Sequence, residues 1–101
     1  MAELNGKNYS RVASVTKAAE VLFFLSDQAA PVSGGELARA LGIPAATAYS
    51  QLYTLVDARL VEVSAYGFQL GTEAARLWVR RKKRLEQLRE EVDRELREIR
   101  L

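Results

Sequence analysis

The side chains best suited to contact a partner lie between residues 44 and 58, in the segment PAATAYSQLYTLVDA. At helical spacing, its outward positions carry hydroxyl and methyl groups, on Ala46, Thr47, Ser50, Tyr53 and Thr54, with Tyr49 at the border. Hydroxyls donate and accept hydrogen bonds and methyl groups give apolar contact, so this surface can match the edges of nucleic-acid bases. The segment contains no Lys or Arg, however. The alternative is therefore a helix that packs against another protein.

The composition excludes most other chemistry. The chain has 101 residues, enough for one small domain, with 49% hydrophobic and 28% charged residues. It has no Cys and no His, which argues against disulfides, zinc sites and the usual nucleophile–base pairs. We expect no enzyme activity, no cofactor and no metal. No apolar run reaches the ~20 residues of a membrane span and the N-terminus lacks a signal peptide, which favours a cytoplasmic location.

The residues before and within this segment predict two short helices joined by a tight turn. Ser33 and Glu36 have the spacing of a capping box, so a helix is expected to start there and run to Leu41. Gly42 can adopt the left-handed backbone that ends a helix, and Pro44 fits the first turn of the next. The apolar faces are formed by Leu37, Ala38 and Leu41, and by Ala48, Leu52 and Leu55. Such helices cross steeply, which leaves the second one able to enter a DNA major groove.

Elements on both sides complete a compact body. Residues 14–25 predict a first helix capped by Ser14, with an apolar stripe of Val15, Ala18, Ala19, Leu22, Phe23 and Leu25. Residues 60–70 alternate and contain a short turn, which predicts a hairpin, or wing. Tyr66 near its tip is either a backbone or groove contact or a plain turn residue. Phe68 and Leu70 are expected to close the core.

A long helix is expected from Thr72, which would cap it, to Leu101, because this segment contains no Pro and no Gly. It predicts a rod of about 45 Å. Apolar residues recur mainly every seven positions, at Trp78, Leu85, Leu88, Val92 and Ile99. This coiled-coil-like stripe has flaws: Arg81 and Glu95 fall on it, and Leu96 is one place off. We expect the stripe to form a homodimer; the alternative is a helix trimmed from a longer protein.

Cationic side chains are unevenly placed. Net charge is only +2, yet Arg80 to Arg84 are five consecutive cations. Because they surround a helix, some are expected to attract phosphate while others are solvated or pair with a partner chain. Lys7, Arg11 and Lys17 are further candidates for phosphate contact, with a frayed terminus or a solvated lysine as the alternative. Ser33, at a helix start, also offers free N–H groups to a phosphate.

With these residues laid out, the chain resembles the N-terminal DNA-binding domain of the IclR family of bacterial transcription regulators. The resemblance covers Ser14 to Gly71. It is carried by the segments Ser14-Val15-x-Lys17-Ala18, Glu36-Leu37-Ala38, Gly42-Ile43-Pro44-x-Ala46-Thr47, Thr54-Leu55, Leu60-Val61 and Phe68-x-Leu70-Gly71. It implies a winged helix-turn-helix dimer with Thr47 and its neighbours at double-stranded DNA.

The chain departs from that family at informative places. The family commonly has Arg where Ser50 stands, an apolar residue where Gln51 stands, and Gly where Arg59 stands. Its large effector-binding domain is expected to be absent here, with the long charged helix in its place. The resemblance therefore does not imply ligand sensing.

These observations predict a mainly α fold with a small β-hairpin, a winged helix-turn-helix followed by a long C-terminal helix. Residues 1–12 are expected to form a flexible arm, 13–71 the winged helix-turn-helix domain, and 72–101 a dimerisation helix. The predicted function is a homodimeric, sequence-specific transcription regulator. The alternative is a winged-helix protein–protein adaptor that does not bind DNA.

Overall fold

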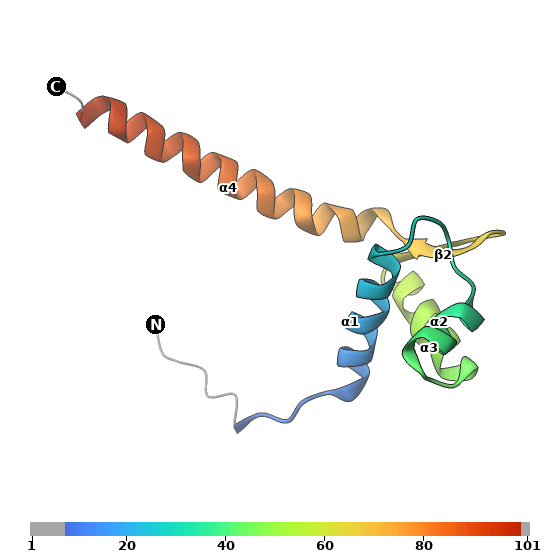
Figure 1. Cartoon of the computed structure of the whole chain (residues 1–101). Coiled ribbons are helices and arrows are strands. Elements are labelled where there is room, and N and C mark those ends of the chain that lie inside the picture. The colour runs from blue at the N-terminus through green and yellow to red at the C-terminus, as the bar shows by residue number, and fades with distance from the viewer. Residues whose placement is uncertain (1–7, 100–101) are drawn as a thin grey trace.

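A computed structural model describes residues 8–99 of the chain. The element order is α1 (Ala13–Ser26), α2 (Gly34–Leu41), α3 (Ala45–Asp57), β1 (Val61–Ser64), β2 (Gly67–Leu70) and α4 (Thr72–Ile99). Figure 1 shows α1, α2 and α3 gathered beside the hairpin, while α4 runs away from them as an isolated rod. We call residues 13–71 the head and α4 the rod. The predicted fold class, a winged helix-turn-helix followed by a long helix, is confirmed.

The core of the head forms where the three helices and the hairpin meet. Its largest fully buried side chains are Val21 of α1, Leu37 of α2, Leu52 of α3 and Val61 of β1. The predicted apolar faces of α2 and α3 are confirmed, since Leu37, Ala38, Ala48, Leu52 and Leu55 are all buried. No buried side-chain nitrogen or oxygen within residues 8–99 lacks a hydrogen-bond partner. The head is therefore well packed.

The ends of α2 and the turn that follows it agree closely with the sequence prediction. Ser33 caps α2: its hydroxyl accepts a hydrogen bond from the Glu36 N–H at 3.1 Å, and the Glu36 carboxylate accepts one from the Ser33 N–H at 3.5 Å. Gly42 ends the helix with φ 65°. Pro44 is one position earlier than predicted, because it is the extended N-cap of α3 and not a helical residue.

The sequence prediction for α1 was wrong in two respects. Ser14 does not cap the helix; Val12 occupies the N-cap, and no side chain bonds there. The buried stripe also differs in part: Leu25 is buried as predicted, and Ala18 and Leu22 pack against the core. Val21, which the prediction left out, is buried, while Val15 and Phe23 are 65% and 70% exposed. Apolar residues occupy most positions of this helix, so more than one stripe fits the sequence, and only packing selects the face.

The hairpin pairs with a third segment. β1 and β2 are antiparallel, with Val61 opposite Leu70 and Ser64 opposite Gly67. Val32, which precedes α2, exchanges both backbone hydrogen bonds with Phe68, at 2.9 and 2.7 Å. Gly67 has φ 125°, and a Cβ there would lie 2.5 Å from the Val32 oxygen. Only glycine permits this close approach, which fixes the wing against the helices.

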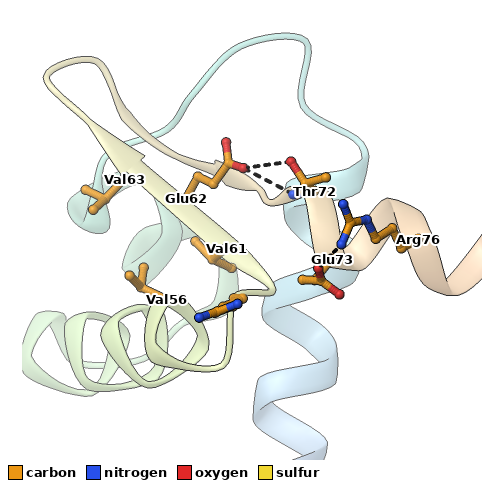
Figure 2. Close-up of a pocket in the computed structure, with 8 residues that line it drawn as sticks. Val56, Val61, Glu62, Val63, Thr72, Glu73 and Arg76 are labelled. Atoms are coloured by element: carbon orange, nitrogen blue, oxygen red, sulfur yellow. Dashed lines mark hydrogen bonds and ion pairs between the residues drawn. The ribbon is translucent and has the colours of Figure 1, made fainter.

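The rod begins through a contact that the sequence did not reveal. Thr72 was predicted to cap α4, but it is the first helical residue. The cap comes from β1, where the Glu62 carboxylate accepts hydrogen bonds from the Thr72 N–H at 3.1 Å and the Thr72 hydroxyl at 3.2 Å (Figure 2). A carboxylate at a helix N-terminus satisfies free N–H groups and complements the helix dipole. Glu62 therefore ties the rod to the wing.

Candidate nucleic-acid interface

The outward face of α3 presents the side chains that the sequence singled out. Ala46, Thr47, Tyr49, Ser50 and Tyr53 are all exposed, while the opposite face of the helix is buried in the head. Thr54, on the same outward side, donates its hydroxyl to the Ser50 carbonyl at 2.7 Å. The hydroxyls of Thr47 and Ser50 have no hydrogen-bond partner within residues 8–99. They are available to a ligand that approaches this face.

The two tyrosines of α3 also have a structural task. The rings of Tyr49 and Tyr53 stack with their centroids 6.5 Å apart, and both meet the ring of Phe68 edge-on, at 6.1 and 5.4 Å. A Cβ on Gly34 would overlap the Tyr49 ring, so this glycine lets α2 approach α3 closely. These contacts lock the outward face to the wing and to the start of α2. The two tyrosines are nevertheless 42% and 50% exposed.

The remaining predicted contact residues are more scattered. Tyr66 lies in the two-residue turn of the hairpin and is 85% exposed. Ser33 is exposed, but its hydroxyl is engaged with Glu36, whose carboxylate lies beside the same helix start. Lys17 forms an ion pair with Glu20 at 2.9 Å. The structure thus gathers the α3 residues on one face, whereas Lys17 and Ser33 are each paired with an acid.

Charge is divided between the head and the rod. Within residues 8–71 there are four cations and five acids. The next thirteen residues, 72–84, hold six cations and a single acid, Glu73. Glu73 pairs with Arg76 at 2.6 Å and approaches Arg80 at 3.8 Å. The strongest attraction for a polyanion therefore lies in the first half of the rod.

A hollow of about 560 Å³ lies at this junction, between β1 and the first turns of α4 (Figure 2). Val56, Val61 and Val63 supply apolar lining, and Glu62, Glu73 and Arg76 supply charged groups that are bonded to one another or to Thr72. Arg59 also lines it and has φ 65°, a left-handed backbone at a position where the resembling family usually has Gly. The hollow is the joint between head and rod.

Lys7 was predicted as a phosphate contact and lies outside the described residues, whereas Arg11 donates to the Tyr9 carbonyl at 2.9 Å. No group of three acidic side chains within residues 8–99 could hold a metal ion. Among these residues, no helix has both the length and the apolar content to cross a membrane.

Sequence reasoning missed two contributors to this region. The Tyr49–Tyr53–Phe68 cluster was signalled by two aromatic residues four positions apart, a spacing at which helical side chains touch. The Glu62 cap had no local signal, because its partner is ten residues further along the chain.

Comparison with known proteins matches the chain over the helices of the head. A search of curated proteins found no relative that matches the chain. The family model described as the IclR helix-turn-helix domain matches residues 14–65, just over half of the chain, from the second residue of α1 into the turn of the wing. That model describes a DNA-binding domain of transcription regulators, and it covers every helix of the head. The chain belongs to the IclR helix-turn-helix domain family.

Proposed function

We propose that this protein is a sequence-specific DNA-binding transcription regulator that acts as a homodimer. The observation that carries the proposal is the outward face of α3, in a domain of a DNA-binding family, where Thr47 and Ser50 are exposed on a helix whose other face is buried. Thr47 and Ser50 would reach base edges, and Ala46 would contact the methyl group of thymine. Tyr66 at the tip of the wing would flank the groove.

The uncharged face of α3 determines which kinds of contact this helix can make with DNA. Because residues 44–58 contain no Lys or Arg, the bidentate Arg–guanine contact is not available from this helix. Recognition would rely on hydroxyl and apolar contacts and on DNA shape, while the cations of residues 76–84 would supply attraction to phosphate. The paired ions at Lys17 and Arg76 make these two residues weaker phosphate ligands than Lys82 or Lys83.

Exposed apolar side chains on the rod support the homodimer part of the proposal. The predicted dimerisation residues Trp78, Leu85, Leu88, Val92 and Ile99 are between 37% and 71% exposed, so the head does not cover them. A second copy would bury them and bring two heads to one DNA site. A site with two-fold symmetry is expected for such a dimer.

A second candidate function is a protein–protein adaptor that kept the winged-helix shape. It is favoured by one observation: the head carries more acids than cations, and α3 carries no cation at all. Under this reading, the face of α3 would pack against another protein, and duplex DNA would bind weakly and without sequence preference.

Two glutamate variants separate these functions. Thr47→Glu and Ser50→Glu place a carboxylate on the outward face of α3, where it would face the polyanion, so each is expected to weaken DNA binding by about tenfold or more. Tyr53 is not a suitable target, because its ring packs against Phe68. Ala29→Glu is the matched control. Ala29 is exposed in the turn after α1, and the substitution adds the same charge there, outside α3.

The measurement is fluorescence anisotropy with a duplex selected from a random library, at a series of salt concentrations. The wild-type affinity is expected to fall as salt rises, with a log–log slope set by the number of phosphates contacted. A slope near zero, or unchanged binding in Thr47→Glu and Ser50→Glu, would favour the adaptor. Circular dichroism of each variant checks that the fold is intact.

A further inference from the structure

Most apolar side chains of the rod form one stripe with an eleven-residue period, while Ala75, Trp78 and Val79 lie beside it. Counted along α4, they follow steps of three, four and four: Ala74, Leu77, position 81, Leu85, Leu88, Val92, Leu96 and Ile99. Arg81 is the one polar member. The seven-residue interpretation left Leu96 out and placed Glu95 on the stripe; the eleven-residue period removes both flaws. It corresponds to about 3.67 residues per turn, so the stripe stays on one face of a nearly straight helix.

The spacing of the residues in this stripe is the same counted from either end of the helix. Its successive steps are three, four, four, three, four, four and three, which is a symmetric series about the pair Leu85 and Leu88. A second copy running in the opposite direction therefore meets it in register. Leu85 would face Leu88 of the second copy, Leu77 would face Leu96, and Arg81 would face Val92.

The charges of the rod are also arranged for opposite directions. Residues 72–84 contain six cations and one acid, whereas residues 85–99 contain six acids and three cations. In a parallel pair, the two cationic halves would lie side by side, and Arg81 would face its own copy across the apolar stripe. In an antiparallel pair, each cationic half lies against the acidic half of the other copy, which is the favourable arrangement.

Four charged side chains beside the stripe also favour the antiparallel orientation. Arg80 and Arg84 lie on the same flank of the helix as Glu91 and Glu95, by their spacing. Each is a like-charged pair at i and i+4, which is unfavourable in a lone helix. Antiparallel packing joins equivalent flanks, so Arg84 would lie opposite Glu91 of the second copy and Arg80 opposite its Glu95. Attraction to the opposite charges of the second copy would then offset the repulsion within each pair.

We propose that α4 pairs with α4 of a second copy in an antiparallel orientation, with Leu85 and Leu88 at the centre of the contact. This inference rests on the proposed homodimer and adds its geometry. The two heads then lie at opposite ends of a rod of about 40 Å. The two half-sites are expected to be separated by more than the single helical turn of DNA, about 34 Å, that adjacent heads would read.

Single cysteines test the orientation directly, because the chain contains none of its own. Ala75, Gln87 and Glu98 lie off the stripe and are exposed, so Ala75→Cys, Gln87→Cys and Glu98→Cys can each carry a spin label. In the antiparallel dimer, the label-to-label distance is shortest at residue 87 and longer by tens of ångströms at residues 75 and 98, since those pairs are about 35 Å apart along the rod. A mixture of labelled Ala75→Cys and Glu98→Cys gives a short distance.

The outcomes separate this inference from the proposed homodimer. Similar short distances at all three positions would overturn the antiparallel orientation and leave a parallel homodimer. A monomeric mass by light scattering at high protein concentration would overturn the homodimer itself, and the orientation with it. Duplex binding measured in the same samples reports separately on α3.

Charge exchange gives an independent test. Arg80→Glu with Arg84→Glu, and separately Glu91→Arg with Glu95→Arg, are each expected to weaken self-association by about tenfold, because like charges then face each other. Mixing the two double variants, or combining all four changes in one chain, restores opposite charges across an antiparallel contact and should recover the association. Failure of both rescues would contradict the proposed pairing.

Discussion

The head and the rod differ in where their apolar side chains go. In the head, ten apolar side chains from all its helices and strands are buried in one core, whereas α4 buries none of its side chains, although Leu77, Trp78, Leu85 and Leu96 are large. The head therefore contains its own source of stability. The rod is held by helical hydrogen bonds and by its attachment to the wing, and its apolar stripe gains stability only with a partner.

This contrast shows that a small chain can combine a firmly held α3 face with a long exposed helix. The outward face of α3 is fixed by the aromatic contacts to Phe68 and by the buried residues on its other side. The rod contacts the head only near its start, where Glu62 caps it. Contacts that fix α3 and contacts that fix α4 can therefore be removed separately.

The largest expected effect comes from removing a core side chain of the head. Leu52 is fully buried, so Leu52→Ala is expected to lower the free energy of unfolding by about 3 kcal/mol, because it loses apolar burial and leaves a cavity. Urea unfolding followed by circular dichroism measures the loss, which should not depend on protein concentration.

Leu88→Ala is the matched change in the rod, where the same side chain is 37% exposed. It is expected to leave the head unchanged at low protein concentration and to lower stability only where the protein self-associates. Equal, concentration-independent losses in Leu52→Ala and Leu88→Ala would contradict the division between head and rod.

A smaller effect is expected at the joint. Glu62→Ala removes both hydrogen bonds to Thr72 and should weaken the start of α4 by about 1 kcal/mol, the usual value of a helix cap. Glu62→Gln keeps an acceptor oxygen and should lose less. Amide hydrogen exchange at Thr72, Glu73 and Ala74 measures the effect. Unchanged exchange in Glu62→Ala would mean that the side chain does not secure the rod.

Local signals in the sequence were sufficient for much of the head. The Ser33–Glu36 capping box, the left-handed Gly42 and the buried faces of α2 and α3 depend on residues within one or two turns of each other, and all were predicted. The hairpin was predicted for the same reason, because alternation and turn residues lie close together in the chain. The exposed α3 face followed from these elements, while its contact with DNA is a proposal.

What the sequence did not reveal depended on contacts between distant segments. The buried face of α1 was predicted only in part, because Val15, Val21 and Phe23 fit different stripes, and packing against α3 and β2 selects Val21. The Val32–Phe68 pairing and the Glu62 cap join residues that no local pattern links. The period of the rod stayed ambiguous because Arg81 interrupts the stripe in either count.

The last expected effect is no larger than that of Glu62→Ala, has the opposite sign, and concerns the turn that leads into the wing. Arg59 holds φ 65°, which is unfavourable for a residue with a Cβ, so Arg59→Gly should raise the free energy of unfolding by about 1 kcal/mol. Ala58→Gly is the control, since Ala58 has φ −80° and gains nothing from glycine; it should lose about 0.5 kcal/mol or more. Urea unfolding of both variants measures the difference. If Arg59→Gly were destabilising, the Arg59 side chain lining the hollow would contribute more than the backbone strain costs, and the joint would depend on that side chain as well as on Glu62.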